Sequence, residues 1–161
     1  MEGFLSEYKG VKQAGVPASL LGAALTGARI NLEKNERIAI IVSMGDSVGA
    51  TTNFSFQQHD AASAGNSKAL SVDNAYYHKV AGATVSTKVV PGAAASSFDL
   101  SALFVADEGI VVFEVLAEDL DVANGYDHIS FDVADTIAAK IVSVVYMTNG
   151  SRFLPAYAEA L

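Results

Sequence analysis

Apolar and polar side chains alternate along most of the chain, which is the pattern of β-strands that bury one face. In "ERIAIIVSMG" (36–45) every second residue is apolar, and "HISFDV" (128–133) follows the same rule, with His128, Ser130 and Asp132 facing out. Short runs rich in Gly, Ser, Asn and Asp separate such segments and predict turns. The predicted strands cover 28–34, 36–45, 51–58, 68–74, 75–80, 84–90, 97–103, 109–120, 128–133 and 140–148. The positions expected to face inward include Ile30, Leu32, Ile38, Ile40, Val42, Met44, Phe54, Phe56, Val111, Phe113, Val115, Ile129, Phe131 and Val133.

The strands are short, evenly spaced and not separated by a convincing long helix. This spacing favours an all-β fold, an antiparallel β-sandwich with jelly-roll topology, over an α/β fold. The segment "KIVSVVYMT" (140–148) is apolar on both faces and is therefore expected to be a central strand.

The sequence divides into an N-terminal arm and one β-sandwich domain. Residues 1–27 are rich in Gly and Ala and lack clear alternation, so we expect an extended, irregular arm with a short helix at Ala18–Leu25. Residues 28–161 form the β-sandwich domain, which ends in a short, partly helical tail, "RFLPAYAEAL".

Composition excludes several classes of protein. The chain has 161 residues, 51% of them hydrophobic, which suits one domain with a sizeable core. Its formal net charge of −8 disfavours binding to nucleic acid or to anionic membranes. The absence of cysteine excludes disulfides, thiol catalysis and Cys-ligated metals.

Three histidines are the candidates for a metal site: His59, His78 and His128. None is spaced from another as H-x-H or H-x-x-x-H, so we expect surface or rim histidines and no bound cofactor. A metal-dependent jelly-roll enzyme stays open as an alternative, and it requires the three to converge.

The stretch "LDVANGYDHISFDV" (120–133) fits either a calcium loop or a tight turn that leads into a strand. The spacing of its carboxylates does not match an EF-hand, because Ala123 stands where an oxygen ligand is needed. Asn124-Gly125 supplies the positive φ angles that a tight turn needs, which favours the turn. A calcium site of another kind would draw on Glu118, Asp119, Asp121, Asn124 and Asp127.

No catalytic motif is present. The chain has no G-x-S-x-G elbow, and "MGDSVGA" (44–50) has no lysine and is not a P-loop. We therefore expect a protein that is not an enzyme.

The order of strands and turns resembles the capsid decoration, cement or head-stabilising proteins of tailed bacteriophages. The resemblance covers roughly residues 29–153. The segments that carry it are "RIAIIVSMGD", "TTNFSFQQHDAASAGNSKAL", "NAYYHKV" and "FEVLAEDLDVANGYDHISFDV".

The resemblance implies a non-enzymatic structural protein on the outside of a phage head, made in the bacterial host cytoplasm. Its expected partners are the major capsid protein and further copies of itself, as a dimer or trimer. Apolar residues outside the alternating strands, and tyrosines in one strand, are the expected contact residues. They are Phe4, Leu5, Tyr8, Val11, Leu20, Leu21, Tyr76, Tyr77, Phe153, Leu154 and Tyr157.

A second class of function stays open. Tail and fibre proteins and carbohydrate-binding modules share similar β-domains. Such a module would recognise a cell surface through an exposed aromatic patch around Tyr76 and Tyr77.

Overall fold

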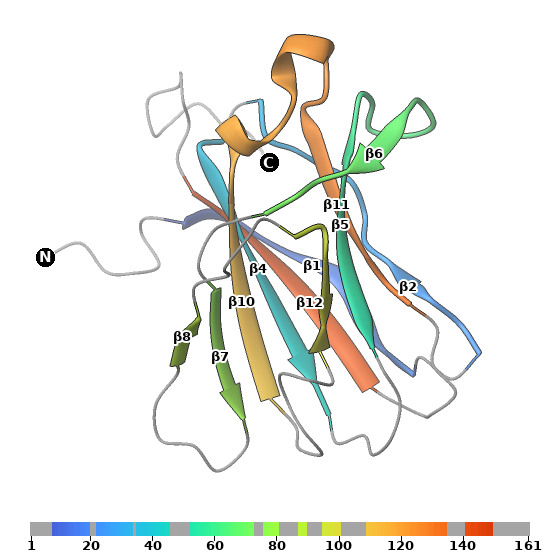
Figure 1. Ribbon diagram of the computed structural model, residues 1–161, viewed down its shortest axis with the longest axis vertical. Coiled ribbons are helices and arrows are strands. Elements are labelled where there is room, and N and C mark those ends of the chain that lie inside the picture. The colour runs from blue at the N-terminus through green and yellow to red at the C-terminus, as the bar shows by residue number, and fades with distance from the viewer. Residues whose placement is uncertain are drawn as a thin grey trace, which may run out of the picture.

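The protein is a sandwich of two antiparallel β-sheets (Figure 1). The computed structural model describes residues 8–19, 22–33, 35–45, 52–72, 76–80, 87–89, 95–100, 109–134 and 141–149; for most of β1 and β8, and for all of β7, the description is of the backbone. The predicted all-β sandwich is confirmed. The jelly-roll topology stays a prediction.

The first sheet has six strands in the order β1-β12-β4-β10-β7-β8. These are β1 (Tyr8–Ser19), β4 (Arg37–Met44), β7 (Tyr76–Val80), β8 (Thr87–Val89), β10 (Gly109–Leu116) and β12 (Ile141–Asn149). The predicted central position of the strand at 140–148 is confirmed, because β12 lies between β1 and β4.

The second sheet also has six strands, in the order β2-β11-β5-β6, with β3 paired to β11 and β9 paired to β5. These are β2 (Leu25–Thr26), β3 (Ile30–Asn31), β5 (Asn53–His59), β6 (Ser67–Ala69), β9 (Ser97–Asp99) and β11 (His128–Val133). The chain crosses repeatedly between the two sheets, after β1, β3, β4, β6, β8, β9, β10 and β11.

The core lies between the sheets and contains the residues that the alternation predicted. All the expected inward positions are buried except Ile30, which is half-buried against the core. Phe54 of the second sheet stacks on Phe113 of the first, with ring centroids 5.4 Å apart, and on Phe131 at 5.3 Å. Full burial of such a side chain contributes about 1.5–3 kcal/mol, so this aromatic cluster is a main source of stability.

The N-terminal segment differs from the irregular arm that the sequence suggested. Tyr8–Ser19 forms an edge strand of the first sheet that pairs with β12, with three register shifts along its length. The expected helix at Ala18–Leu25 is not found at its two ends, which belong to β1 and β2. Glycines and Pro17 interrupt the alternation of β1, and an edge strand tolerates both residue types.

One end of the sandwich carries the longest described connections. Loop 60–66 joins β5 to β6, and two short 3-10 helices, η2 (Ala117–Asp119) and η3 (Val122–Asn124), join β10 to β11 (Figure 1). A hydrogen bond of 2.8 Å from the Asp121 N–H to the Gln58 Oε1 ties the second connection to β5, next to the start of loop 60–66. This end therefore brings polar residues from four strands into contact.

Candidate functional site

The polar residues gather on the outer face of the second sheet and at this end. Because the phenylalanines of β5 and β11 point into the core, the residues between them lie on the opposite face. The pairing of β5 with β11 has no register shift, so the outward residues of the two strands are neighbours. On β5 they are Ser55, Gln57 and His59, and on β11 they are His128, Ser130 and Asp132.

His59 is the centre of the first polar network. It is only 3% exposed, although it lies on the outer face of the sheet. Its Nδ1 lies 2.7 Å from the Ser67 Oγ, and its Nε2 lies 2.7 Å from the Ser130 Oγ. Burial, followed by the positive charge of Arg29, lowers the pKa of His59 and favours the neutral ring. The expectation of a surface or rim position for His59 is therefore wrong.

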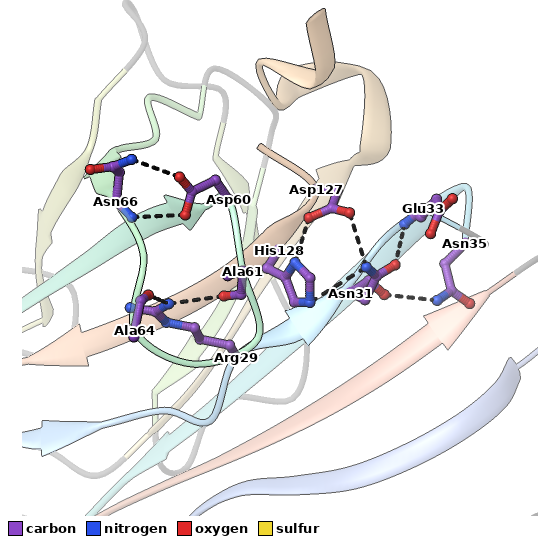
Figure 2. Close-up of polar contacts among 10 residues, drawn as sticks. All are labelled: Arg29, Asn31, Glu33, Asn35, Asp60, Ala61, Ala64, Asn66, Asp127 and His128. Atoms are coloured by element: carbon purple, nitrogen blue, oxygen red, sulfur yellow. Dashed lines mark hydrogen bonds and ion pairs between the residues drawn. The ribbon is translucent and has the colours of Figure 1, made fainter. Parts of the chain in front are cut away.

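Arg29 is connected to this network through Ser67, which it shares with His59. The guanidinium donates hydrogen bonds to the carbonyl oxygens of Ala61, at 2.9 Å, and of Ala64 (Figure 2). It also donates to the Ser67 Oγ at 3.3 Å. The planar guanidinium has several donors in fixed directions, so one side chain can bond both loop 60–66 and the start of β6.

The same loop is closed by Asp60 and Asn66. The backbone N–H and the side-chain amide of Asn66 each donate to the Asp60 carboxylate, both at 2.7 Å (Figure 2). These hydrogen bonds lower the pKa of Asp60. Ala64 and Gly65 adopt left-handed backbone conformations, with φ of 57° and 68°, which complete the tight bend.

Asp121 organises the connection between β10 and β11. Its carboxylate accepts hydrogen bonds from the Lys68 ammonium and, at 2.9 Å, from the Asn124 amide. These two contacts lower its pKa, with Lys68 having the larger effect. The Lys68 Nζ also lies 4.3 Å from the ring centroid of Tyr126. Both oxygens of Asp121 are therefore engaged within the chain.

The turn at 120–127 is closer to the predicted tight turn than to a calcium loop. Gly125 has the expected positive φ, 84°, but Asn124 does not, because it belongs to η3. The Asp119 carboxylate accepts the Leu116 N–H at 2.8 Å. In the part of the chain that the structure describes, no group of three or more metal-ligating side chains occurs. The calcium alternative gains no geometric support from these residues.

A second network surrounds Asn31. Its side-chain amide donates to Asp127 at 3.2 Å and lies 3.4 Å from the Nε2 of His128, while Asp127 also contacts the His128 Nδ1 (Figure 2). The Asn31 Oδ1 accepts the Glu33 N–H at 2.7 Å. This network fixes the start of β11 against the chain around β3.

His59 and His128, the two histidines whose side chains the structure describes, do not share a site of the kind that a jelly-roll enzyme would need. His59 and His128 are directly opposite each other on β5 and β11, but each is bonded to its own set of partners. The backbone of His78 lies in β7, which belongs to the other sheet.

The contact between Ser130 and His59 has the distance of a nucleophile and its general base. However, Ser130 is only 2% exposed. The other nitrogen of His59 bonds a serine hydroxyl in place of the carboxylate that commonly orients a catalytic histidine. A substrate carbonyl cannot reach this hydroxyl in the described conformation, so the geometry indicates a structural network.

The predicted contact residues are described only in part. Tyr8 and Val11 belong to β1, and Tyr76 and Tyr77 belong to β7, where the backbone of Tyr77 lies opposite Val112 of β10. The others lie outside the described residues: Phe4, Leu5, Leu20, Leu21, Phe153, Leu154 and Tyr157.

Sequence reasoning missed the network of Arg29, His59, Ser67 and Ser130. Its members come from three separate segments, and no spacing along the chain connects them. The only signal was the presence of Arg29 and Ser130 at polar positions of two predicted strands, because His59 follows the predicted strand 51–58 and was expected in a loop.

Comparisons with known protein families, with curated proteins and with solved structures give no match to this chain. Among the described residues, none of the helices has the length and apolar character required to cross a membrane.

Proposed function

We propose that this chain is a non-enzymatic structural protein of a tailed-bacteriophage virion. It binds the outside of the head as a homo-oligomer and stabilises contacts between major capsid subunits. It is made in the host cytoplasm and is located on the capsid exterior. The proposal rests on the resemblance in the order of strands and turns, and on two features of the described residues.

The observation that carries the proposal is the position of β1. This strand of 12 residues pairs with β12 along one edge, and none of the described strands pairs with its other edge. An open edge has backbone N–H and C=O groups that can pair with a strand of a neighbouring protein. Two of the expected contact residues, Tyr8 and Val11, belong to this strand.

The polar end of the sandwich supports a structural role. Its hydrogen bonds link carboxylates, amides and Arg29 to one another and to the backbone, which holds two connections in fixed shapes. Fixed loops suit a protein that makes repeated contacts on a regular surface, because little conformational entropy is lost on binding. Many modest contacts across a capsid then add to a large total stabilisation.

Binding to capsids tests the proposal. Deleting residues 1–25 would remove β1 itself, so we choose two single substitutions, Lys12→Pro and Gln13→Pro, in its exposed middle. Successive N–H groups of a strand point to opposite edges, so one of the two prolines should spare the pairing with β12. The spared variant keeps the thermal stability of the wild type.

Heads that lack the protein are mixed with wild type or with each variant, and occupancy is measured by sedimentation. We expect wild type to saturate the heads and to raise their resistance to heating. The proline variant with normal stability should lose most of its binding. Wild-type protein that leaves the heads empty would refute the proposed function, and full occupancy by that proline variant would refute the role of the β1 edge.

A further inference from the structure

The two outer faces of the sandwich have opposite character. The outer face of the second sheet is polar, and its side chains bond one another. On the first sheet the register of β10, β4 and β12 has no shift, so the outward residues form straight rows across the three strands. One row consists of Val112, Ile41 and Val145, and the next of Glu114, Ala39 and Met147. The apolar side chains of the two rows are half-buried, except that of Met147, which is buried.

The apolar rows continue to the end of the face. Ile110 and Ile141 also point outward and are 46% and 57% exposed. Only one other large hydrophobic residue of the described chain, Val122 in η3, is exposed to this degree. We call the outward residues of β10, β4 and β12 the apolar face. They are Arg37, Ala39, Ile41, Ser43, Ile110, Val112, Glu114, Leu116, Ile141, Ser143, Val145 and Met147.

We infer that the apolar face is the contact surface between two copies of this chain, packed sheet against sheet about a two-fold axis. The inference deepens the homo-oligomer part of the proposed function and rests on that part alone. A contiguous apolar surface of this kind marks an interaction site, and a free protein needs it covered from synthesis onward. A second copy is present from the moment of synthesis, before any capsid is met.

The charges favour a second copy. A chain with a net charge of −8 repels itself, so two copies associate best through a surface without acidic excess. The three central strands place two charged residues on the apolar face, Arg37 and Glu114, which form an ion pair of 3.0 Å.

The outer face of the first sheet is large enough for a dimer, with the apolar face at its centre. With strands about 5 Å apart and about 3.3 Å per residue, the three strands of the apolar face cover on the order of 400 Å². The whole outer face of the six strands covers on the order of 700 Å². A standard protein interface buries about 800 Å² per partner. Two such faces, lined by Ile and Val, can pack about 10 Å apart as sheets do within one domain.

The oligomeric state tests the inference. We expect light scattering with size exclusion to give the wild type twice the chain mass of 16.7 kDa. The double variant Ile110→Lys/Ile141→Lys changes two exposed positions and should give the single-chain mass. Because neither side chain lies in the core, the variant should still unfold cooperatively on heating, as a folded monomer does. The matched control is Val122→Lys, an equally exposed residue off the face, which should remain a dimer.

A second measurement does not depend on lysine substitutions. The chain has no cysteine, so Ser43→Cys places one thiol in the middle of the apolar face, and Ser71→Cys places one at an exposed position outside the first sheet. We expect the thiol at 43 to react at least tenfold more slowly than the thiol at 71, with the difference lost on dilution to the monomer.

Each other outcome overturns the inference. A wild type that stays at the single-chain mass at all concentrations has no such dimer. A dimer that survives the double lysine variant uses another surface. If the wild type is a monomer and the double lysine variant no longer binds capsids, the apolar face is assigned to the capsid. If the monomeric wild type floats with lipid vesicles, the apolar face is assigned to a membrane. Dimerisation and capsid occupancy are measured separately, so this inference can fail while the proposed function stands.

Discussion

His59 and Ser130 are joined across neighbouring strands by a contact of 2.7 Å between Nε2 and Oγ, with both side chains almost fully buried. The position is unusual because it lies on the outer face of the sheet, where side chains are commonly exposed. A buried polar pair of this kind gives little net stability while it is intact, but it is costly to break.

Replacing Ser130 by alanine should therefore destabilise the fold. The change leaves one nitrogen of His59 buried without its partner, and we expect the free energy of unfolding to fall by about 1–3 kcal/mol. Chemical denaturation measures this loss. Ser71→Ala, at an exposed position, is the control and should change stability by less than about 0.5 kcal/mol. Equal stability of Ser130→Ala and wild type would show that water replaces the hydroxyl.

The stability of the protein should depend on the protonation of His59. Burial and then Arg29 lower its pKa in the folded state, against weaker opposing effects of Asp132 and Asp60, while His128 acts with Arg29. As the pH falls through about 6.5, the unfolded chain takes up a proton that the folded protein does not, so the free energy of unfolding decreases. It stops decreasing once the pH is below the folded-state pKa.

Denaturation at several pH values checks this prediction. His59→Gln should remove the decrease in the free energy of unfolding that occurs as the pH falls through about 6.5, although the substitution lowers stability at every pH. Asp60 and Asp121 have lowered pKa values, so their contributions are lost only as the pH falls below about 3.9, in a separate window. A wild type with flat stability from pH 7.5 to 5 would contradict the assignment to His59.

Gly27 should not tolerate a side chain. A Cβ there would overlap the ring of Phe131 and lie 2.8 Å from the hydroxyl of Tyr146. Both rings are fully buried, so Gly27→Ala should cost about 1–3 kcal/mol or more through overpacking. Gly45→Ala is the matched control, because its nearest neighbour would be the Ile141 carbonyl oxygen at 3.8 Å. If both variants unfold at the same temperature, the core around Gly27 is looser than described.

Arg29 should control the order of loop 60–66. Arg29→Lys keeps the charge but cannot reproduce the donors to two carbonyl oxygens and Ser67. We expect faster hydrogen exchange at the loop amides and at Ser67. Arg37→Lys alters an ion pair on the other sheet and serves as the control. Unchanged exchange in Arg29→Lys would mean that the Asp60–Asn66 closure alone holds the loop.

The strands and the core could be predicted from sequence because their pattern is local. Alternation identified Ile40, Phe54 and Phe131 as inward positions, and all are fully buried. The strand β12 was expected to be central because both of its faces are apolar. Its outward residues Val145 and Met147 belong to the apolar face.

The polar networks and β1 could not be predicted in the same way. The network of His59 includes Arg29, which is 30 positions earlier, and Ser130, which is 71 positions later. The strand β1 has glycines and a proline, and it becomes a strand only through pairing with a partner that is more than 120 residues away. Non-local contacts of this kind leave no periodic signal.

The pairing of β1 with β12 also constrains how the protein can be made. The first described strand cannot find its partner until the last one has left the ribosome. Synthesis therefore leaves the first sheet unfinished at its β12 side, and closure of so large a loop is slow. We expect this protein to depend on chaperones during the interval between the emergence of β11 and that of β12 from the ribosome.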